Sequence, residues 1–130
     1  MTPGIAGSGA EPGSPPGGVP LRSRGVIIEH ALLTVHPDSR PEFEAAFTAA
    51  TELISVMPGF QSLILSACAE RSDTYLLLVA WDTLEDHTRG FRGSAEYARW
   101  SALLHPFYDP FPTVQHFSPV VCVPARSASR

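Results

Sequence analysis

Three side chains that could take part in polar chemistry lie within apolar parts of the chain. His30 interrupts the apolar run 26–35, Trp81 ends the apolar run 75–81, and His87 follows on a predicted helix, on the face that carries Leu84 and Phe91. A histidine has an intrinsic pKa of about 6.5, so it can act as a base near neutral pH. An indole N–H donates one hydrogen bond. Converging in one apolar cavity, these groups would offer proton abstraction and hydrogen-bond donation to a bound small molecule.

Each candidate also has a purely structural interpretation. A histidine among apolar residues is satisfied by a backbone carbonyl, and a strand-end tryptophan fills a core with its N–H bonded nearby. Further aromatic residues are candidates to line the cavity, although aromatic residues at such spacings more often belong to the core. This substrate-binding set comprises Phe47, Tyr75, Phe91, Tyr97, Trp100 and Tyr108. The facing of His116 stays undecided, and no paired-histidine spacing predicts a metal site.

Apolar periodicity predicts the elements that must position these residues. The runs 26–35, 60–67, 75–81 and 114–121 have the composition of strands. A helical pattern follows Pro41 and ends at Pro58-Gly59, and a second helical segment begins at a Thr83 cap and restarts at a Ser94 cap. The order strand, helix, strand, strand, helix, strand predicts an α+β, ferredoxin-like βαββαβ fold with a four-stranded antiparallel sheet.

The parity of the first strand predicts which residues face the helices. We expect His30 on the helix side, and Ile27, Ala31 and Leu33 on the other face. If this second face were open to solvent, its apolar side chains would form a larger patch than soluble monomers usually expose. The pattern therefore predicts a homodimer in which two sheets pack face to face.

Composition limits the size of the protein and its partners. The chain has 130 residues, of which 44% are hydrophobic and 17% charged, as expected for one globular domain. We expect this domain at 25–123, between disordered Gly/Pro-rich residues 1–24 and a short tail at 124–130. A net charge of −4 argues against nucleic-acid or anionic-membrane partners, and no apolar run is long enough to span a bilayer. Cys68 and Cys122 form no disulfide or zinc motif, which favours the cytoplasm.

Several motifs resemble one family. The chain carries MPGF at 57–60, VAW at 79–81, LEDHTRGFRGSAEYARW at 84–100 and PTVQHF at 112–117. These motifs are similar to the antibiotic biosynthesis monooxygenase family of dimeric α/β barrels, over residues 26–120. The resemblance implies Trp81 in a substrate cavity and a polar pocket residue at the position of His30. Haem-degrading members carry the iron-ligating histidine at the position of Phe91, so that activity lacks its ligand here.

The leading hypothesis is a cofactor-independent monooxygenase that oxidises an aromatic polyketide-type phenol to a quinone in secondary metabolism. A deprotonated phenol is electron-rich enough to reduce dioxygen, so the protein must bind the hydrophobic aromatic substrate, remove a proton and exclude water. We expect His30 or His87 as the base and Trp81 as a hydrogen-bond donor, without metal or organic cofactor. The alternative is a non-redox polyketide cyclase or isomerase in which His30 enolises the substrate, and a third reading is a binding protein without catalysis.

Overall fold

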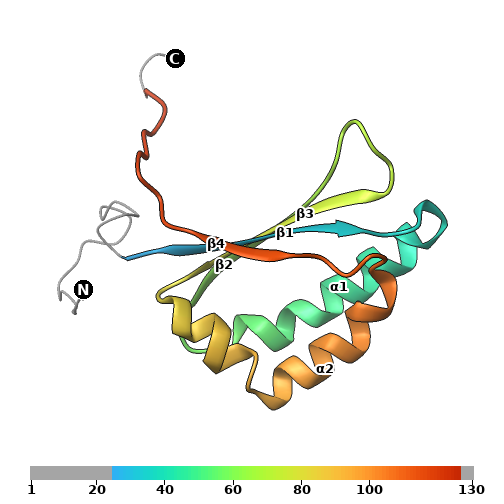
Figure 1. The fold of residues 1–130 in the computed structure, drawn as a ribbon, viewed down its shortest axis with the longest axis horizontal. Helices are drawn as coiled ribbons and strands as arrows, with labels where there is room; N and C mark the ends of the chain where they lie inside the picture. Colours follow the sequence, from blue (N-terminus) through green and yellow to red (C-terminus); the bar gives the residue numbers. More distant parts are fainter. Residues whose placement is uncertain (1–24, 127–130) are drawn as a thin grey trace.

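A computed structural model describes residues 25–126 of the chain (Figure 1). The tail predicted at 1–24 and the last residues of the tail predicted at 124–130 lie outside the described residues. No helix within the described part is both long and apolar enough to cross a membrane. The elements in chain order are β1 (Ile27–Thr34), η3 (Pro37–Ser39), α1 (Arg40–Ser55), β2 (Phe60–Ala67), β3 (Thr74–Trp81), η4 (Asp86–Phe91), α2 (Ala95–Leu104), η5 (His105–Phe107) and β4 (Val114–Phe117).

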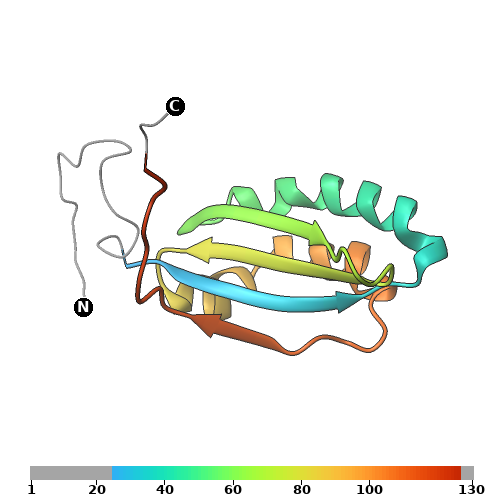
Figure 2. The same cartoon turned by 90° about the horizontal axis from the view of Figure 1, so that it is seen from above.

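The strands form one antiparallel sheet in the order β2-β3-β1-β4, and the helices cover one of its faces (Figure 2). This arrangement confirms the predicted α+β, ferredoxin-like fold. The central strands β1 and β3 pair along their whole length, from Ile27 opposite Trp81 to Thr34 opposite Thr74. The core lies between the sheet and the helices, and its largest fully buried side chains include Trp81, Phe43 and Phe91.

The facing of β1 is opposite to the prediction. Ala31 and Leu33 are 1% exposed and pack in the core under the helices, with Glu29 on the same side. His30 lies on the open face, where its ring meets that of Phe117 edge-on at 5.5 Å between centroids. The parity prediction was wrong because both faces of this strand are apolar, so alternation gives no preference. The open face nevertheless remains apolar, since it carries Leu32, which is 49% exposed.

The segment between β3 and α2 contains the two helix caps that the sequence predicted, at Thr83 and Ser94. The backbone N–H of Thr83 donates to Asp86 Oδ2 at 3.2 Å, and the backbone N–H of Asp86 donates to Thr83 Oγ1 at 3.1 Å, which is a reciprocal helix cap. The chain then forms a short π-helix, η4, that turns His87 and Phe91 inward, each 2% exposed. Such turns are frequent at functional sites. The hydroxyl of Ser94 accepts from the Tyr97 N–H and starts α2.

The chain beyond β4 departs from the sheet. The predicted strand 114–121 ends at Phe117, two residues before Pro119, which lacks the N–H that a strand requires. Residues 118–126 then rise on the side of the sheet opposite the helices (Figure 1). Val120 and Val121 in this segment are 81% and 75% exposed.

Candidate active site

A cavity of about 350 Å³ lies between the sheet and the segment formed by η4, α2 and the loop before β4. Its volume is within the range of small-molecule sites, roughly 300 to 1,000 Å³. Its wall combines aromatic, aliphatic and ionisable side chains. The lining residues are Glu29, Ala31, Leu33, Leu77, His87, Phe91, Arg92, Tyr97, Trp100, His105, Tyr108, Phe111, Pro112 and Val114.

A buried carboxyl is the central polar group of this cavity. Glu29 is 7% exposed, and its Oε1 accepts a hydrogen bond of 3.0 Å from the indole N–H of Trp81. The Nε2 atom of His87 lies 3.4 Å from the same oxygen. The rings of Trp81 and His87 stack with centroids 5.6 Å apart. Three residues from β1, β3 and η4 therefore meet at one carboxylate oxygen.

The contact chain continues from His87 to a second histidine. His87 Nδ1 and His116 Nε2 are 2.8 Å apart, so one of these two nitrogens donates a hydrogen bond to the other. His116 is half-buried on β4, where it pairs with Glu29 of β1 and so shares the helix side of the sheet. The facing of His116, undecided from the sequence, is thereby resolved. Glu29, His87 and His116 form a continuous polar row from the cavity toward the sheet edge.

Burial shifts the ionisation of these groups in opposite directions. Burial lowers the pKa of His87 to about 3, and repulsion from Arg92 and from any proton charge on His116 adds to the shift. Burial raises the pKa of Glu29, although the Trp81 hydrogen bond and Arg92 act against that shift. His87 is therefore neutral at neutral pH, so its 3.4 Å contact with Glu29 is a polar contact and no ion pair. A carboxyl with a raised pKa is the group here that best suits a general base near neutrality.

The tyrosine beside this row keeps its proton. Burial raises the pKa of Tyr108, and the nearby charge of Glu29 adds to the shift. Its hydroxyl is therefore available as a hydrogen-bond donor to a ligand. Burial lowers the pKa values of His105, which lines the cavity, and of His116, which contacts His87, so both histidines favour their neutral forms.

The structure brings together only part of the predicted set. His87, Phe91, Tyr97, Trp100 and Tyr108 line the cavity. Trp81 is fully buried behind them and reaches the cavity through its hydrogen bond to Glu29. His30 is on the far face of the sheet, so the prediction that it faces this cavity was wrong.

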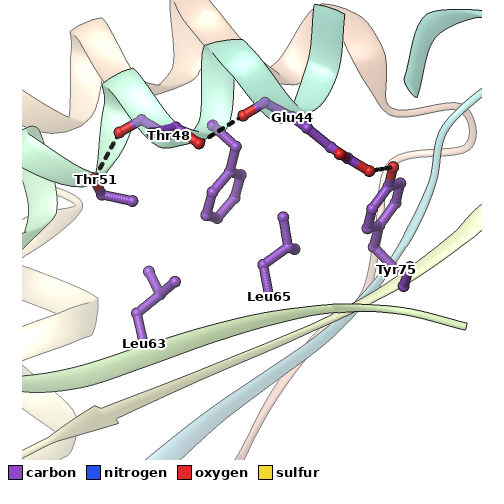
Figure 3. Close-up of a pocket in the computed structure, with 8 residues that line it drawn as sticks. Glu44, Thr48, Thr51, Leu63, Leu65 and Tyr75 are labelled. Carbon is purple, nitrogen blue, oxygen red and sulfur yellow. Dashed lines mark hydrogen bonds between the residues drawn. The ribbon is translucent and has the colours of Figure 1, made fainter. Parts of the chain in front are cut away.

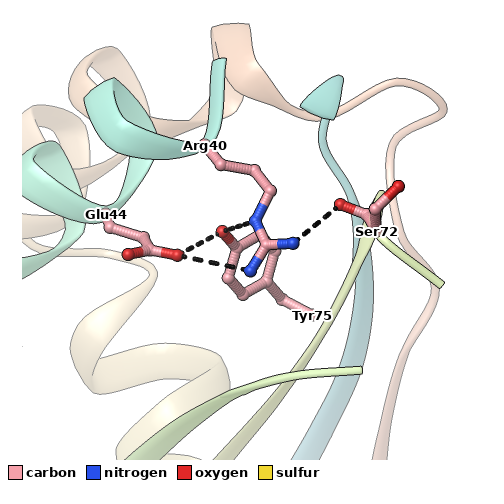
Figure 4. Close-up of polar contacts among 4 residues, drawn as sticks. All are labelled: Arg40, Glu44, Ser72 and Tyr75. Atoms are coloured by element: carbon pink, nitrogen blue, oxygen red, sulfur yellow. Dashed lines mark hydrogen bonds and ion pairs between the residues drawn. The ribbon is translucent and has the colours of Figure 1, made fainter. Parts of the chain in front are cut away.

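Phe47 and Tyr75 lie at a different hollow, of about 420 Å³, between α1 and β2 (Figure 3). There the Tyr75 hydroxyl donates to Glu44 Oε2 at 2.5 Å and accepts from Arg40 Nε at 2.9 Å (Figure 4). Arg40 also donates to the backbone carbonyl of Ser72. These bonds tie the start of α1 to the β2–β3 loop, so Tyr75 acts as a structural anchor there.

Sequence reasoning missed Glu29, Arg92 and the roles of His105 and His116. One signal was present, because Glu29 is a charged residue in the middle of an otherwise apolar strand, where burial is costly unless a partner compensates. Within residues 25–126, no three His, Cys, Asp or Glu side chains are grouped to hold a metal ion.

Comparisons with known proteins agree with this architecture. The family model described as antibiotic biosynthesis monooxygenase matches residues 26–103. The uncharacterized protein YczJ of Bacillus subtilis (strain 168) is 54% identical over 95 residues, which are 73% of this chain and 100% of YczJ.

Solved structures share the fold. The putative antibiotic biosynthesis monooxygenase of Bordetella bronchiseptica is 31% identical with a TM-score of 0.71, over 75% of this chain and 99% of that one. SnoaB, a cofactor-independent oxygenase from Streptomyces nogalater, is 17% identical with a TM-score of 0.67, over 78% of this chain and 99% of its own. By the family-model match over residues 26–103 and the 31% identity to the Bordetella bronchiseptica protein, the chain belongs to the antibiotic biosynthesis monooxygenase family.

Proposed function

We propose that this protein is a cofactor-independent monooxygenase that oxidises an aromatic, polyketide-type phenol to a quinone. The observation that carries the proposal is the buried carboxyl of Glu29, which accepts from Trp81 and borders an aromatic cavity of about 350 Å³. The family supports oxygenation as the reaction class. SnoaB adds support for a cofactor-free reaction by analogy of fold alone.

The reaction begins with proton transfer. The Glu29 carboxylate accepts the phenol O–H proton, and the resulting phenolate reduces dioxygen. A C–O bond forms at the ring carbon opposite the phenol oxygen, and the peroxide takes a proton. Loss of the ring C–H proton then breaks the O–O bond, leaves a second carbonyl and releases water. One phenol and one dioxygen give one quinone and one water, so no external reductant is consumed.

The remaining lining residues bind the ring and stabilise charge. Phe91, Tyr97 and Trp100 offer flat apolar surface for a planar substrate. Tyr108 keeps its proton and is placed to donate a hydrogen bond to a developing oxyanion. Apolar surface beside the peroxide disfavours water there, which favours oxygenation over release of reduced oxygen.

A polyketide cyclase or isomerase is the second candidate. The neighbouring pair of a carboxyl with a raised pKa and a neutral His87 favours it, because such a pair can enolise a ketone and polarise its carbonyl. A cyclase consumes no dioxygen. Turnover under strict anaerobiosis therefore separates the two candidates.

Oxygen uptake by purified, metal-free protein with naphthol or anthrone substrates tests the leading proposal. Glu29→Gln keeps the size of the side chain and an acceptor for Trp81 but removes the base, so kcat should fall about 10²- to 10⁴-fold. Glu44→Gln, at the other hollow, is the matched control and should retain activity. Wild-type protein that consumes no oxygen with any such phenol would contradict the proposal.

We also propose that the protein works as a homodimer in the cytoplasm, where Cys68 and Cys122 stay free thiols. The open sheet face supports a second copy as the partner, because Leu32 and Phe117 are each 49% exposed there and Ile64 is 59% exposed. The apolar segment 118–126 rises on the same side (Figure 1).

Sedimentation velocity at micromolar concentration tests the dimer. Ile64→Lys should shift the protein toward monomer because it puts a charge in the proposed interface. Val56→Lys is the control, since Val56 is also exposed but lies at the end of α1, away from the open face. A monomeric wild type would refute the dimer and leave the active-site proposal intact.

A further inference from the structure

We infer that His116 is a positioning residue that fixes the tautomer of His87, so that the N–H groups of Trp81 and His87 both face Glu29 Oε1 and leave Oε2 as the more basic oxygen. The inference rests on the proposed function for its catalytic meaning. It also makes a statement about the resting protein that requires no substrate. Its basis is the row of contacts from Trp81 through Glu29 and His87 to His116.

Both contacts to the carboxyl converge on one oxygen. Trp81 Nε1 lies 3.0 Å from Glu29 Oε1, and an indole nitrogen only donates. His87 Nε2 lies 3.4 Å from the same oxygen. If His87 carries its proton on Nε2, Oε1 accepts the Trp81 hydrogen bond and faces a second N–H dipole, so its basicity falls. The other oxygen, Oε2, then remains for a ligand in the cavity.

The tautomer of His87 depends on what faces its other nitrogen. A neutral imidazole has one N–H and one acceptor nitrogen, and a donor opposite one nitrogen forces the proton onto the other. His116 Nε2 faces His87 Nδ1 at 2.8 Å. A proton on His116 Nε2 therefore places the His87 proton on Nε2, toward Glu29. The reverse arrangement would point a His87 lone pair at the carboxylate, which is repulsive.

The charges around the row favour this arrangement. Arg92 lies close enough to stabilise the Glu29 carboxylate and to disfavour protonation of either histidine. The charge of Glu29 also raises the pKa of Tyr108, which lines the same cavity. These charges therefore favour the protonation state in which Glu29 is ionised and both histidines are neutral.

Three substitutions at position 116 test the inference, because they present different groups to His87 Nδ1. His116→Gln can donate and should keep the His87 proton on Nε2. His116→Met offers no strong hydrogen-bonding group, so only Glu29 biases the tautomer and the Nε2–H population should fall below that of the wild type. His116→Glu accepts and should draw the proton onto Nδ1. The control is His36→Gln, since the His36 side chain is 71% exposed and its Nδ1 contacts Asp38, outside the row.

The direct measurement is the ¹⁵N chemical shift of the two ring nitrogens of His87 in labelled, ligand-free protein. We expect the Nε2–H form in the wild type and in His116→Gln, and the Nδ1–H form in His116→Glu. A wild-type His87 with its proton on Nδ1, or a tautomer that ignores all three substitutions, would overturn the inference whether or not the protein is an oxygenase.

Kinetics then connect the tautomer to catalysis. If the proposed oxygenase activity is present, kcat should fall about 10-fold or more in His116→Glu with little change in KM. His116→Gln should keep a kcat close to that of the wild type. The acid limb of the pH profile should move only in variants that change the tautomer. Equal loss of kcat in Gln, Met and Glu variants would mean that His116 acts through packing, and would refute the positioning role.

Discussion

Acidification should destabilise the folded protein through His87. The side chain is 3% exposed, and its pKa falls from 6.5 to about 3 on folding. Between these two values the unfolded chain binds a proton that the folded protein excludes, so the free energy of unfolding rises with pH and is lost as the pH falls. The maximum slope is about 1.4 kcal/mol per pH unit. From about pH 7 to about pH 5, His87 alone should remove about 2 kcal/mol of stability.

Urea denaturation followed by tryptophan fluorescence measures this loss, because Trp81 and Trp100 are both buried and report on unfolding. In His87→Gln the loss between the two pH values should be smaller than in the wild type by about 2 kcal/mol. His36→Gln should behave like the wild type.

One neighbour acts in the opposite direction. The pKa of Glu29 is raised on folding, so its protonation stabilises the folded protein as the pH falls. This contribution is common to the wild type and His87→Gln unless the two side chains are coupled, and a Glu29→Gln background measures that coupling. An identical pH dependence for the wild type and His87→Gln in both backgrounds would refute the idea that His87 is buried in its neutral form.

Three further substitutions have defined outcomes. Gly59→Ala should lower the urea midpoint by the equivalent of about 1 to 3 kcal/mol, since φ is +84° and the new Cβ would clash with the Asp86 carboxylate. Unchanged stability would contradict this. Trp81→Phe removes the N–H that lowers the pKa of Glu29, so the acid limb of the activity profile should move to higher pH. Tyr75→Phe should cost about 1 kcal/mol in the same denaturation assay and leave activity unchanged, because its hydroxyl bonds lie at the second hollow.

Local patterns in the sequence were sufficient for the order of the elements and for several of their ends. The Thr83 cap and the Ser94 cap each depend on residues within three positions, and both bonds are present in the structure. The inward facing of His87 also followed from near neighbours on one helical face. Such contacts form between residues that are close in the sequence, so they can be predicted from a single sequence.

The facing of β1 could not be predicted in the same way. Ile28 and Leu32 on one side are as apolar as Ala31 and Leu33 on the other. A shift of one residue exchanges the two faces of a strand, and only the helices and the neighbouring strands decide which face is buried. His30 was therefore assigned to the cavity, and the residue next to it, which does line the cavity, was overlooked.

The sequence by itself determined the family, the antiparallel α+β fold and an aromatic cavity with Trp81 and His87 beside it. Only the tertiary structure decided that Glu29 is the carboxyl at its centre and that His116 completes the row. Glu29 meets Trp81 across 52 positions of sequence, and it meets His116 through the pairing of β1 with β4. Which group holds a proton there depends on burial and on charges brought together by strand register, and these arise only when the sheet forms.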